Sequence, residues 1–478
     1  MMGVGLASVA IAVLLGVPAL VFLILHTFFA KQDPTSLPRG NMGWPFLGET
    51  IGYLKPHRSN TMGTFLQTHC SWYGKVFKSH LFGCPTIVSC DHDLNTFVLQ
   101  NEEKLFQSSY PKPVHGILGK LSMMLVSGDL HRKLRSVAVS FIATSRSMPE
   151  FLHSVEKLTI SVMKSWEDRQ EVAFFREAKE FTLYVMLKYL LSIEPEDLIA
   201  SSILEDFLTF MKGFISLPLN VPGSSYAKAV KARTRISSTL KEVIKERQNG
   251  NGGLAKKDFL DGILVKENLS NEEKVSVLLD LLLAGYETTS ALLGIVVYFL
   301  GQAPHVLEHL KAEHQEIRKN KKDGEPLNWE DYKQMEFTSN VISESLRCGN
   351  VVKFVHRKAL QDVTFKGYLI PSGWKVLPVL TAANLDPSLH EDPSDFNPWR
   401  WTDQAMSKKV NPFGGGLRLC PGAELAKVET ACFLHHLVLN YRWKIKGDDF
   451  PISCPFLEFK RGLVLELEPL EKKIGSKA

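Results

Sequence analysis

Apolar residues are arranged in three different ways along this 478-residue chain. Residues 4–29 form one apolar run in which only His26 can carry a charge. From about residue 150 to residue 346, apolar positions recur at helical spacing and predict a series of long helices. Segments rich in Val, Ile and Phe predict strands at residues 75–89, 359–379 and 457–467. The pattern predicts a mainly α-helical body with small β sheets.

The first thirty residues predict a transmembrane anchor. The 26 residues of the apolar run would span roughly 39 Å as a helix, enough to cross a hydrocarbon core of about 30 Å. A cleaved secretory signal is the alternative, but it has a shorter apolar run after a basic segment. Lys31 and Arg39 follow the run and put the body on the cytosolic side. We expect a single-pass anchor in the endoplasmic reticulum membrane at residues 1–30, a Pro/Gly hinge at 31–45 and a catalytic domain at 46–478.

The longest predicted helix contains an unusual polar interruption. Ser270 and Glu273 form a capping-box pattern, an apolar run follows over residues 275–300, and Pro304 ends it. About thirty residues give a helix near 45 Å long. Its middle, residues 284–289, reads AGYETT. A glycine, an acid and two threonines are locally unfavourable in an apolar helix, which indicates a functional segment.

The second chemical candidate is a cysteine loop, FGGGLRLCPG at residues 413–422. Cys420 follows a glycine-rich turn and precedes a proline and a glycine. A haem-ligating thiolate needs a backbone that approaches the porphyrin closely, and backbone N–H groups near the sulfur favour the thiolate. Arg418 offers a guanidinium for a haem propionate. The alternative is a buried cysteine beside a flexible loop.

These residues resemble the cytochrome P-450 family of haem-thiolate monooxygenases, whose haem-loop positions match Phe413, Gly416, Arg418, Cys420 and Gly422. The resemblance implies a triangular α-rich body in which haem b lies between the long central helix and the helix after the cysteine loop. It also implies Cys420 as the axial iron ligand, O2 as oxidant, and electrons from NADPH through a separate cytochrome P-450 reductase.

The segments GWPFLGET and LLLAGYETTS, together with the cysteine loop, resemble plant microsomal members that hydroxylate sterols in brassinosteroid biosynthesis, particularly at carbon 22 of the campesterol side chain. Relatives that act on another brassinosteroid carbon, on abscisic acid or on diterpenoids share these motifs and remain alternatives. A haem-thiolate isomerase or dehydratase, and a haem-binding carrier or sensor, are further alternatives.

In the long helix the resemblance implies that Ala284 and Gly285 make room for dioxygen, while Glu287 and Thr288 deliver protons during O–O cleavage. The intact Glu287–Thr288 pair argues against the isomerase. The alternative is a helix crossing at small residues, with a threonine bonded to its own backbone.

Further residues are assigned by the same resemblance. His131, which stands where the family has tryptophan, Arg135 and Arg357 are expected to contact haem propionates; the alternatives are a surface histidine and a strand-edge arginine. The E-x-x-R pair Glu344 and Arg347 is expected to join Arg400 in a buried structural network. Apolar residues expected to contact the sterol are Leu118, Met124, Leu283, Val352, Phe354 and Leu457.

Charge and cysteine content narrow the remaining possibilities. The net charge is +5 and there is no long basic run, so nothing indicates nucleic-acid binding. Seven cysteines without zinc-site spacing indicate a reducing compartment.

Residues 211–221 are expected to dip into the lipid surface or to form a buried helix end. A basic face for the reductase, or a set of ordinary solvated side chains, is predicted from Arg132, Lys133, Lys408, Lys409 and Lys427.

Overall fold

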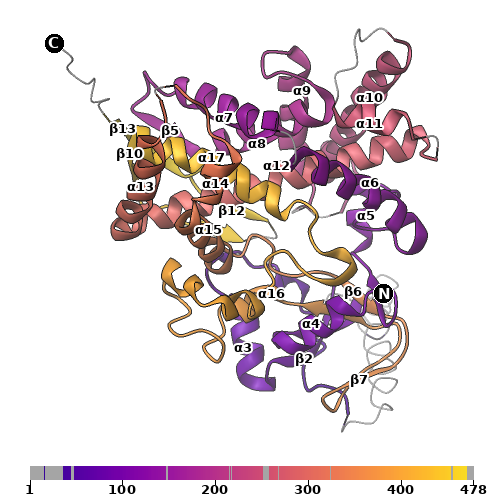
Figure 1. Cartoon of the computed structure of the whole chain (residues 1–478). Coiled ribbons are helices and arrows are strands. Elements are labelled where there is room, and N and C mark those ends of the chain that lie inside the picture. Colours follow the sequence, from indigo (N-terminus) through magenta and orange to yellow (C-terminus); the bar gives the residue numbers. More distant parts are fainter. Residues whose placement is uncertain are drawn as a thin grey trace, which may run out of the picture.

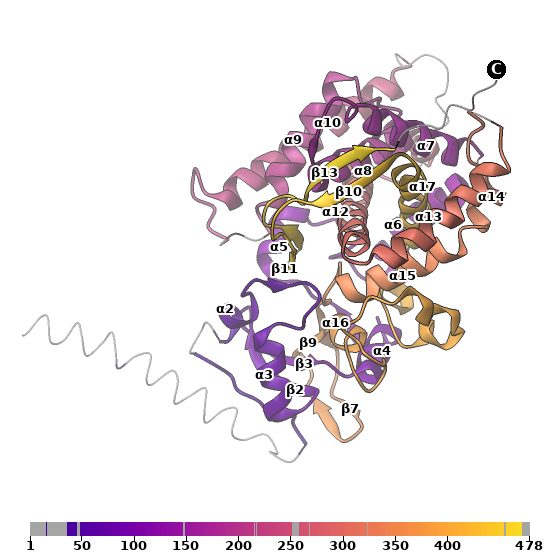
Figure 2. The same cartoon turned by 90° about the vertical axis from the view of Figure 1, so that its left-hand side faces the viewer.

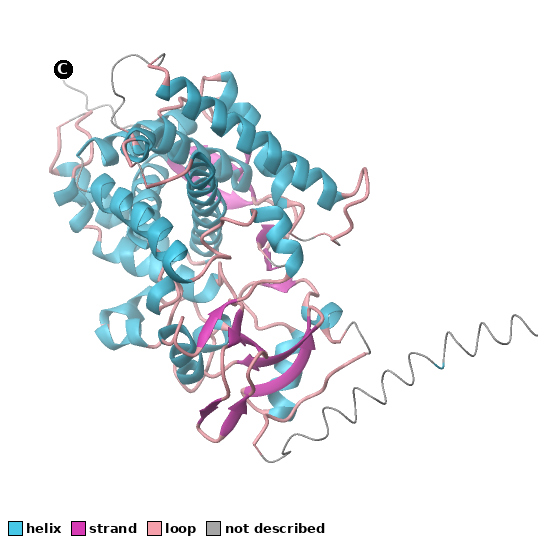
Figure 3. Cartoon of the chain, turned by 90° about the vertical axis from the view of Figure 1, so that its right-hand side faces the viewer, coloured by secondary structure: helices cyan, strands magenta, loops and turns pink. Residues whose placement is uncertain are grey.

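The computed structural model describes residue 16 and residues 36–44, 48–146, 149–214, 216, 218–250, 258–266, 268–322, 324–453 and 456–470. The predicted anchor, apart from Gly16, and part of the predicted hinge lie outside the described residues. Helices fill one end of the molecule and most strands gather at the other (Figure 1, Figure 3). A mainly α-helical body with small sheets is therefore confirmed.

The helices are α2 Thr50–Tyr53, α3 Thr64–Tyr73, α4 His92–Gln100, α5 Lys112–Leu118, α6 Gly128–Arg146, α7 Pro149–Lys164, α8 Phe174–Leu191, α9 Leu198–Met211, α10 Ser225–Gln248, α11 Phe259–Leu264, α12 Asn271–Gln302, α13 Pro304–Lys319, α14 Trp329–Lys333, α15 Glu336–Gly349, α16 Leu380–Asn384 and α17 Ala423–Asn440. Short 3-10 helices are η1 Pro398–Thr402, η2 Gln404–Lys408 and η3 Gly416–Arg418.

Helix α12 runs through the middle of the helical part (Figure 2) and packs along α8. Its start is set by the predicted capping box: Ser270 Oγ accepts from the Glu273 N–H at 3.2 Å, and Glu273 Oε2 accepts from the Ser270 N–H at 2.8 Å. Pro304 begins α13 directly afterwards. Among the described residues, α12 is the helix long and apolar enough to cross a membrane, but 78% of its most apolar window is buried in the protein. It is a core helix.

The largest sheet has the strand order β2-β3-β9-β6-β4. Strands β3 and β9 pair in parallel, and the other neighbours are antiparallel. Its strands are β2 Val76–Leu81, β3 Cys84–Ser89, β4 Phe106–Ser108, β6 Arg357–Ala359 and β9 Lys375–Pro378.

The remaining strands form three smaller sheets: β1 His57–Arg58 with β11 Pro451–Ser453 and β12 Leu457–Phe459; β10 Tyr441–Ile445 with β13 Val464–Pro469 and β5 Glu171–Ala173; and β7 Val363–Phe365 with β8 Tyr368–Ile370. All three predicted strand regions contain strands. The loop from α15 to β6, residues 350–356, connects the helical part to the largest sheet.

Candidate active site

A cavity of about 210 Å³ lies between the middle of α12, the cysteine loop, the end of α6 and the loop at residues 351–355. It brings together segments that are more than a hundred residues apart in the chain. The predicted site residues that line it are Ala284, Gly285, Thr288, Arg357, Phe413, Arg418, Cys420 and Gly422.

Cys420 lies between η3 and α17. Its N–H donates to the Phe413 carbonyl at 2.9 Å, which closes the loop. Burial raises the pKa of the Cys420 thiol, although a hydrogen bond from the Gly422 N–H and the nearby Arg135 charge act in the opposite direction. The groups expected to favour the thiolate are thus present. In the protein alone, burial raises the thiol pKa by more than these groups lower it. A bound metal cation deprotonates such a thiol outright.

The glycines of the loop differ in what they contact. Gly416 has φ +61°, and a Cβ there would lie 2.1 Å from the Leu99 carbonyl oxygen, so this position packs against α4 and does not line the cavity. Gly414 and Gly415 face the cavity instead. Gly414, Gly415 and Gly422 are therefore the loop glycines that a bound group can approach closely.

Arg418 and Arg357 share one buried carboxylate. The Glu102 carboxylate forms an ion pair with Arg418 Nε through Oε1 and another with Arg357 Nε through Oε2, each with an N···O distance of 2.6 Å. Arg418 also donates to the Met123 carbonyl at 2.8 Å. Both guanidiniums line the cavity that holds the Cys420 thiol. Two cations and a thiol facing one mainly apolar space fit a haem with its propionates.

His131 and Arg135 lie on one face of α6, as expected, but neither lines the cavity. His131 is only 3% exposed, and its closest acid is Glu103, 4.0 Å from Nδ1. Burial, helped by the charges of Arg418 and Arg135, lowers the pKa of His131 to about 4, so the imidazole is neutral at pH 7. Arg135 donates to the Leu419 carbonyl and thereby holds the residue before Cys420.

The middle of α12 has features of both interpretations given above: a segment that faces the reaction site, and a helix crossing at small residues with a threonine bonded to its own backbone. Thr288 faces the cavity, and its hydroxyl donates to the Ala284 carbonyl at 2.7 Å. Gly285 also faces the cavity, but a Cβ there would lie 2.5 Å from Met186 Cγ and Sδ. The glycine therefore allows the close approach of α8 as well as leaving room in the cavity.

Glu287 is buried behind the cavity, next to a lysine that the sequence did not single out. Lys179 Nζ lies 3.8 Å from Glu287 Oε2 and 3.0 Å from Glu458 Oε1. Burial raises the pKa of Glu287 to about 7, and Lys179 opposes this rise. The Glu458 side chain is half exposed. Glu458, Lys179 and Glu287 therefore form a row of charged groups from solvent to Glu287, which directly precedes Thr288.

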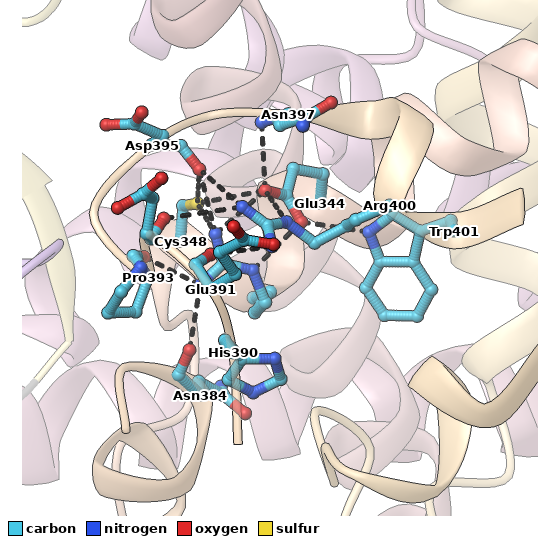
Figure 4. Close-up of polar contacts among 12 residues, drawn as sticks. Glu344, Cys348, Asn384, His390, Glu391, Pro393, Asp395, Asn397, Arg400 and Trp401 are labelled. Atoms are coloured by element: carbon cyan, nitrogen blue, oxygen red, sulfur yellow. Dashed lines mark hydrogen bonds and ion pairs between the residues drawn. The ribbon is translucent and has the colours of Figure 1, made fainter. Parts of the chain in front are cut away.

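Glu344 joins the other two members of the predicted network, Arg347 and Arg400; Glu344 and Arg400 are labelled in Figure 4. Glu344 accepts from Arg347 at 2.7 and 2.9 Å and from Arg400 Nε at 2.9 Å. Trp401 Nε1 donates to the same carboxylate at 2.9 Å. Burial raises the pKa of Glu344, but these hydrogen bonds and the Arg347 charge outweigh it and hold the pKa below its ordinary value. The network ties α15 to η1.

Of the six residues expected to contact substrate, Val352 lines the cavity. Leu118, Leu283 and Leu457 are buried members of the hydrophobic core clusters. The backbone carbonyl of Met124 accepts from Ser108, and Phe354 faces Tyr53 on the other side of its loop. Apolar lining that the sequence did not single out comes from Phe141, Ile142, Met186, Leu281 and Leu380.

Two buried acids near the cavity were also not predicted. Glu429 on α17 lines it, and burial raises the pKa of this carboxyl to about 8. Asp280 accepts from Ser122 Oγ at 2.8 Å and from the Met123 N–H at 2.7 Å, which attaches the loop before α6 to α12. The sequence signal that could have identified Glu429 and Asp280 is an acidic residue within an apolar helical run.

Three of the five predicted basic-face residues are paired with acids. Lys133 lies 2.7 Å from Glu273 and Lys427 lies 3.1 Å from Glu424. Arg132 contacts Asp129 and Glu103. Lys408 is exposed at the end of η2. This part of the surface therefore carries less free positive charge than the sequence indicated.

Comparisons with known proteins agree with this geometry. A model of the family Cytochrome P450 matches residues 38–470. The chain is 55% identical to Cytochrome P450 724B1 of Oryza sativa subsp. japonica, covering 98% of this chain and 99% of that protein. It is 46% identical to Cholesterol 22-monohydroxylase CYP90B52 of Paris polyphylla, covering 94% and 97%. The structure of retinoic acid bound cyanobacterial CYP120A1 matches with a TM-score of 0.81 and 26% identity, covering 92% of this chain and all of that one. This chain therefore belongs to the cytochrome P450 family.

Proposed function

We propose that this protein hydroxylates carbon 22 of a campesterol-type sterol side chain in brassinosteroid biosynthesis. Relatives that are 42–46% identical over more than nine-tenths of this chain are named cholesterol 22-hydroxylases or steroid (22S)-hydroxylases. Like other members of its family, the protein is a haem-thiolate monooxygenase that uses O2 and electrons supplied by a reductase.

The observation that carries the proposal is the cavity itself. The Cys420 thiol and the Thr288 hydroxyl face one space whose remaining walls are mainly aliphatic. A largely apolar sterol loses little hydration on entering such a space, and its orientation is decided by shape. The carbon nearest the reactive centre would then be the one oxidised.

Haem b fits this cavity, with Cys420 as the iron ligand and Arg357 and Arg418 as propionate partners. When bound, it supplies the O2 and one-electron chemistry that side chains lack. Gly414 and Gly415 leave space against its surface. Glu102 would hold both arginines in position, and the Gly422 N–H and Arg135 would stabilise the charge on Cys420.

The protein's own contribution to the reaction is delivery of protons. Glu458, at the surface, takes protons from solvent, and Lys179 links it to Glu287. Glu287 has a pKa of about 7, so it can both take up and release a proton near neutral pH. Thr288 then presents its hydroxyl to the cavity. This pair also favours oxygen activation over an isomerase or dehydratase reaction, and over a carrier or sensor without turnover.

The same proposal includes a membrane location. Residues 1–30 would anchor the catalytic domain to the cytosolic side of the endoplasmic reticulum membrane. Leu219 and Val221, between α9 and α10, are 56% and 58% exposed and would enter the lipid surface. The reductase would dock near Lys408 and Lys409, where the cysteine loop is close in the chain.

The experiment is turnover of campesterol by membranes that contain this protein, a plant cytochrome P-450 reductase and NADPH, with products identified by mass spectrometry. A carbon monoxide difference spectrum of the same membranes checks the haem-thiolate centre. A 22-hydroxylated product that depends on NADPH is expected. Spectrally intact protein that leaves campesterol unchanged would overturn the campesterol assignment; later brassinosteroid intermediates, abscisic acid and diterpenoids would then be tested in turn.

A further inference from the structure

A second cavity, of about 260 Å³, lies on the other side of the loop that lines the first. Residues of α2, of α3 and of the segment around β1 line it; α2 and α3 lie at the lower left of Figure 2. Val351, Val352 and Val355 face the haem cavity, whereas Lys353 and Phe354 face the second one. The loop at residues 351–355 is therefore a wall shared by two cavities.

Two lysines line this second cavity, and Lys353 is the buried one, whereas Lys55 is exposed. Lys353 is only 6% exposed, its ammonium contacts His57 Nε2, and it lies 3.4 Å from the Thr61 carbonyl. Across the described segments of the chain, no carboxylate forms an ion pair with it. Burial lowers the pKa of Lys353 to about 7. A buried ammonium without an anionic partner is costly, and an anion bound beside it would offset that cost.

The hydrogen bonds of Lys353 leave one donor free. His57 Nδ1 lies 3.0 Å from the Lys55 carbonyl, which can only accept, so Nδ1 carries the proton and Nε2 is an acceptor. An ammonium has three N–H donors, and His57 and Thr61 use two of them. Tyr53 also lines this cavity, and its hydroxyl is buried without a hydrogen-bond partner in the described part of the structure.

The rest of the cavity wall is apolar. Met62, Phe65 and Phe354 line it, and Trp72, which is 65% exposed, stands at its edge. A buried cation and a buried, unpaired hydroxyl on the wall of a mainly apolar space match an amphiphile with an acidic head and a hydrocarbon body.

We propose that this cavity is a ligand site for an amphiphile whose carboxylate or phosphate pairs with Lys353 and Tyr53 and whose hydrocarbon part lies against Met62, Phe65 and Phe354. A ligand held there contacts the back of the loop that lines the haem cavity, so its binding changes the affinity of the haem cavity for its own ligands.

The test uses the full-length haem protein in phosphatidylcholine nanodiscs, titrated with 10-bromodecanoate, whose bromine quenches tryptophan fluorescence. Saturable quenching is expected, with the quenched component absent in Trp72→Phe. In Lys353→Met the affinity should fall by roughly tenfold or more, the loss expected for one charge-assisted contact. Lys333→Met, which removes an exposed lysine on α14, should bind like the wild type. Non-saturable quenching, or equal affinity in Lys353→Met and wild type, would overturn the site.

Two further readouts complete the test. An unchanged carbon monoxide difference spectrum in Lys353→Met shows that the fold is intact. Nanodiscs with added phosphatidate distinguish the ligand's source: displacement of bromodecanoate identifies a lipid phosphate, and no displacement identifies a free carboxylate. Imidazole affinity, read from the haem spectrum, should change by roughly threefold or more at saturating decanoate, since typical coupling between sites is of that order or larger. An identical imidazole affinity would overturn the coupling.

Discussion

The ammonium of Lys179 lies 3.8 Å from the carboxylate of Glu287, in a part of the protein where both side chains are almost completely buried. Glu287 has no closer polar partner among the described residues. Lys179 is therefore the group that limits how far burial raises the pKa of Glu287, and this relationship can be tested through pH dependence.

Replacing Lys179 with methionine should move the pH profile of turnover to higher pH. Without the cation, burial acts unopposed and the pKa of Glu287 rises above about 7, so a smaller fraction is ionised at neutral pH. Product formed per NADPH should fall at pH 7, with more peroxide released. Lys188→Met, on the same helix but paired with the exposed Glu194, is the control. Identical pH profiles for Lys179→Met and wild type would contradict the proton path.

Cys420→Ala should abolish the haem-thiolate signal in the carbon monoxide difference spectrum, because the substitution removes the proposed iron ligand. Cys84→Ala, on strand β3, removes another half-buried thiol and should leave the spectrum unchanged. If the Cys420 variant kept the full signal, the ligand assignment would be wrong.

Arg347→Leu should destabilise the protein by about 3–5 kcal/mol, because it removes a partner from the fully buried carboxylate of Glu344. A large drop in the thermal unfolding midpoint and in the yield of haem-containing protein is expected. Arg176→Ala removes an exposed arginine that pairs with Glu180 on its own helix and with the exposed Glu205 on α9, and its midpoint should stay close to wild type. An unchanged midpoint in Arg347→Leu would show that the network adds little stability.

Gly416→Ala should prevent the cysteine loop from packing on α4. The residue has φ +61°, and the new Cβ would meet the Leu99 carbonyl oxygen, which is backbone and cannot move aside cheaply. Loss of haem incorporation is expected. In Gly262→Ala, on α11, the new Cβ meets open space, and the helix should gain up to about 1 kcal/mol. Normal haem content in Gly416→Ala would refute the packing argument.

Glu429→Gln should stabilise the protein at neutral and alkaline pH but not at acid pH. The pKa of Glu429 rises from 4.5 to about 8 on burial, so the folded protein keeps a proton that the unfolded chain releases. Between about pH 4.5 and pH 8 this group therefore lowers stability by about 1.4 kcal/mol for each pH unit. The unfolding midpoint of the variant should exceed that of wild type increasingly from pH 5 to pH 8. Equal midpoints for Glu429→Gln and wild type at pH 8 would contradict the prediction.

Local sequence signals predicted the elements that depend on neighbouring residues. The capping box at Ser270 and the proline at position 304 predicted the limits of α12, because helix ends are set by side chains within one turn. The E-x-x-R pair predicted that Glu344 and Arg347 share a helix face, since residues three apart are neighbours there. The cysteine loop and the AGYETT segment together indicated the family and its haem chemistry.

Other features were decided only when distant segments packed together. Glu102 and Lys179 sit in ordinary amphipathic stretches, and nothing nearby in the chain shows that one joins Arg357 to Arg418 or that the other reaches Glu287. Likewise, Val352 and Phe354 look equivalent as apolar residues of one loop, yet they face two different cavities.

The sequence by itself thus determined the class of fold, the family and the central helix with its polar interruption, because these follow from periodicity, caps and short motifs. The tertiary structure decided which charges are paired, which glycines face the cavity and which apolar side chains line it. Those properties depend on burial and on contacts between residues far apart in the chain, and neither quantity is encoded in local spacing.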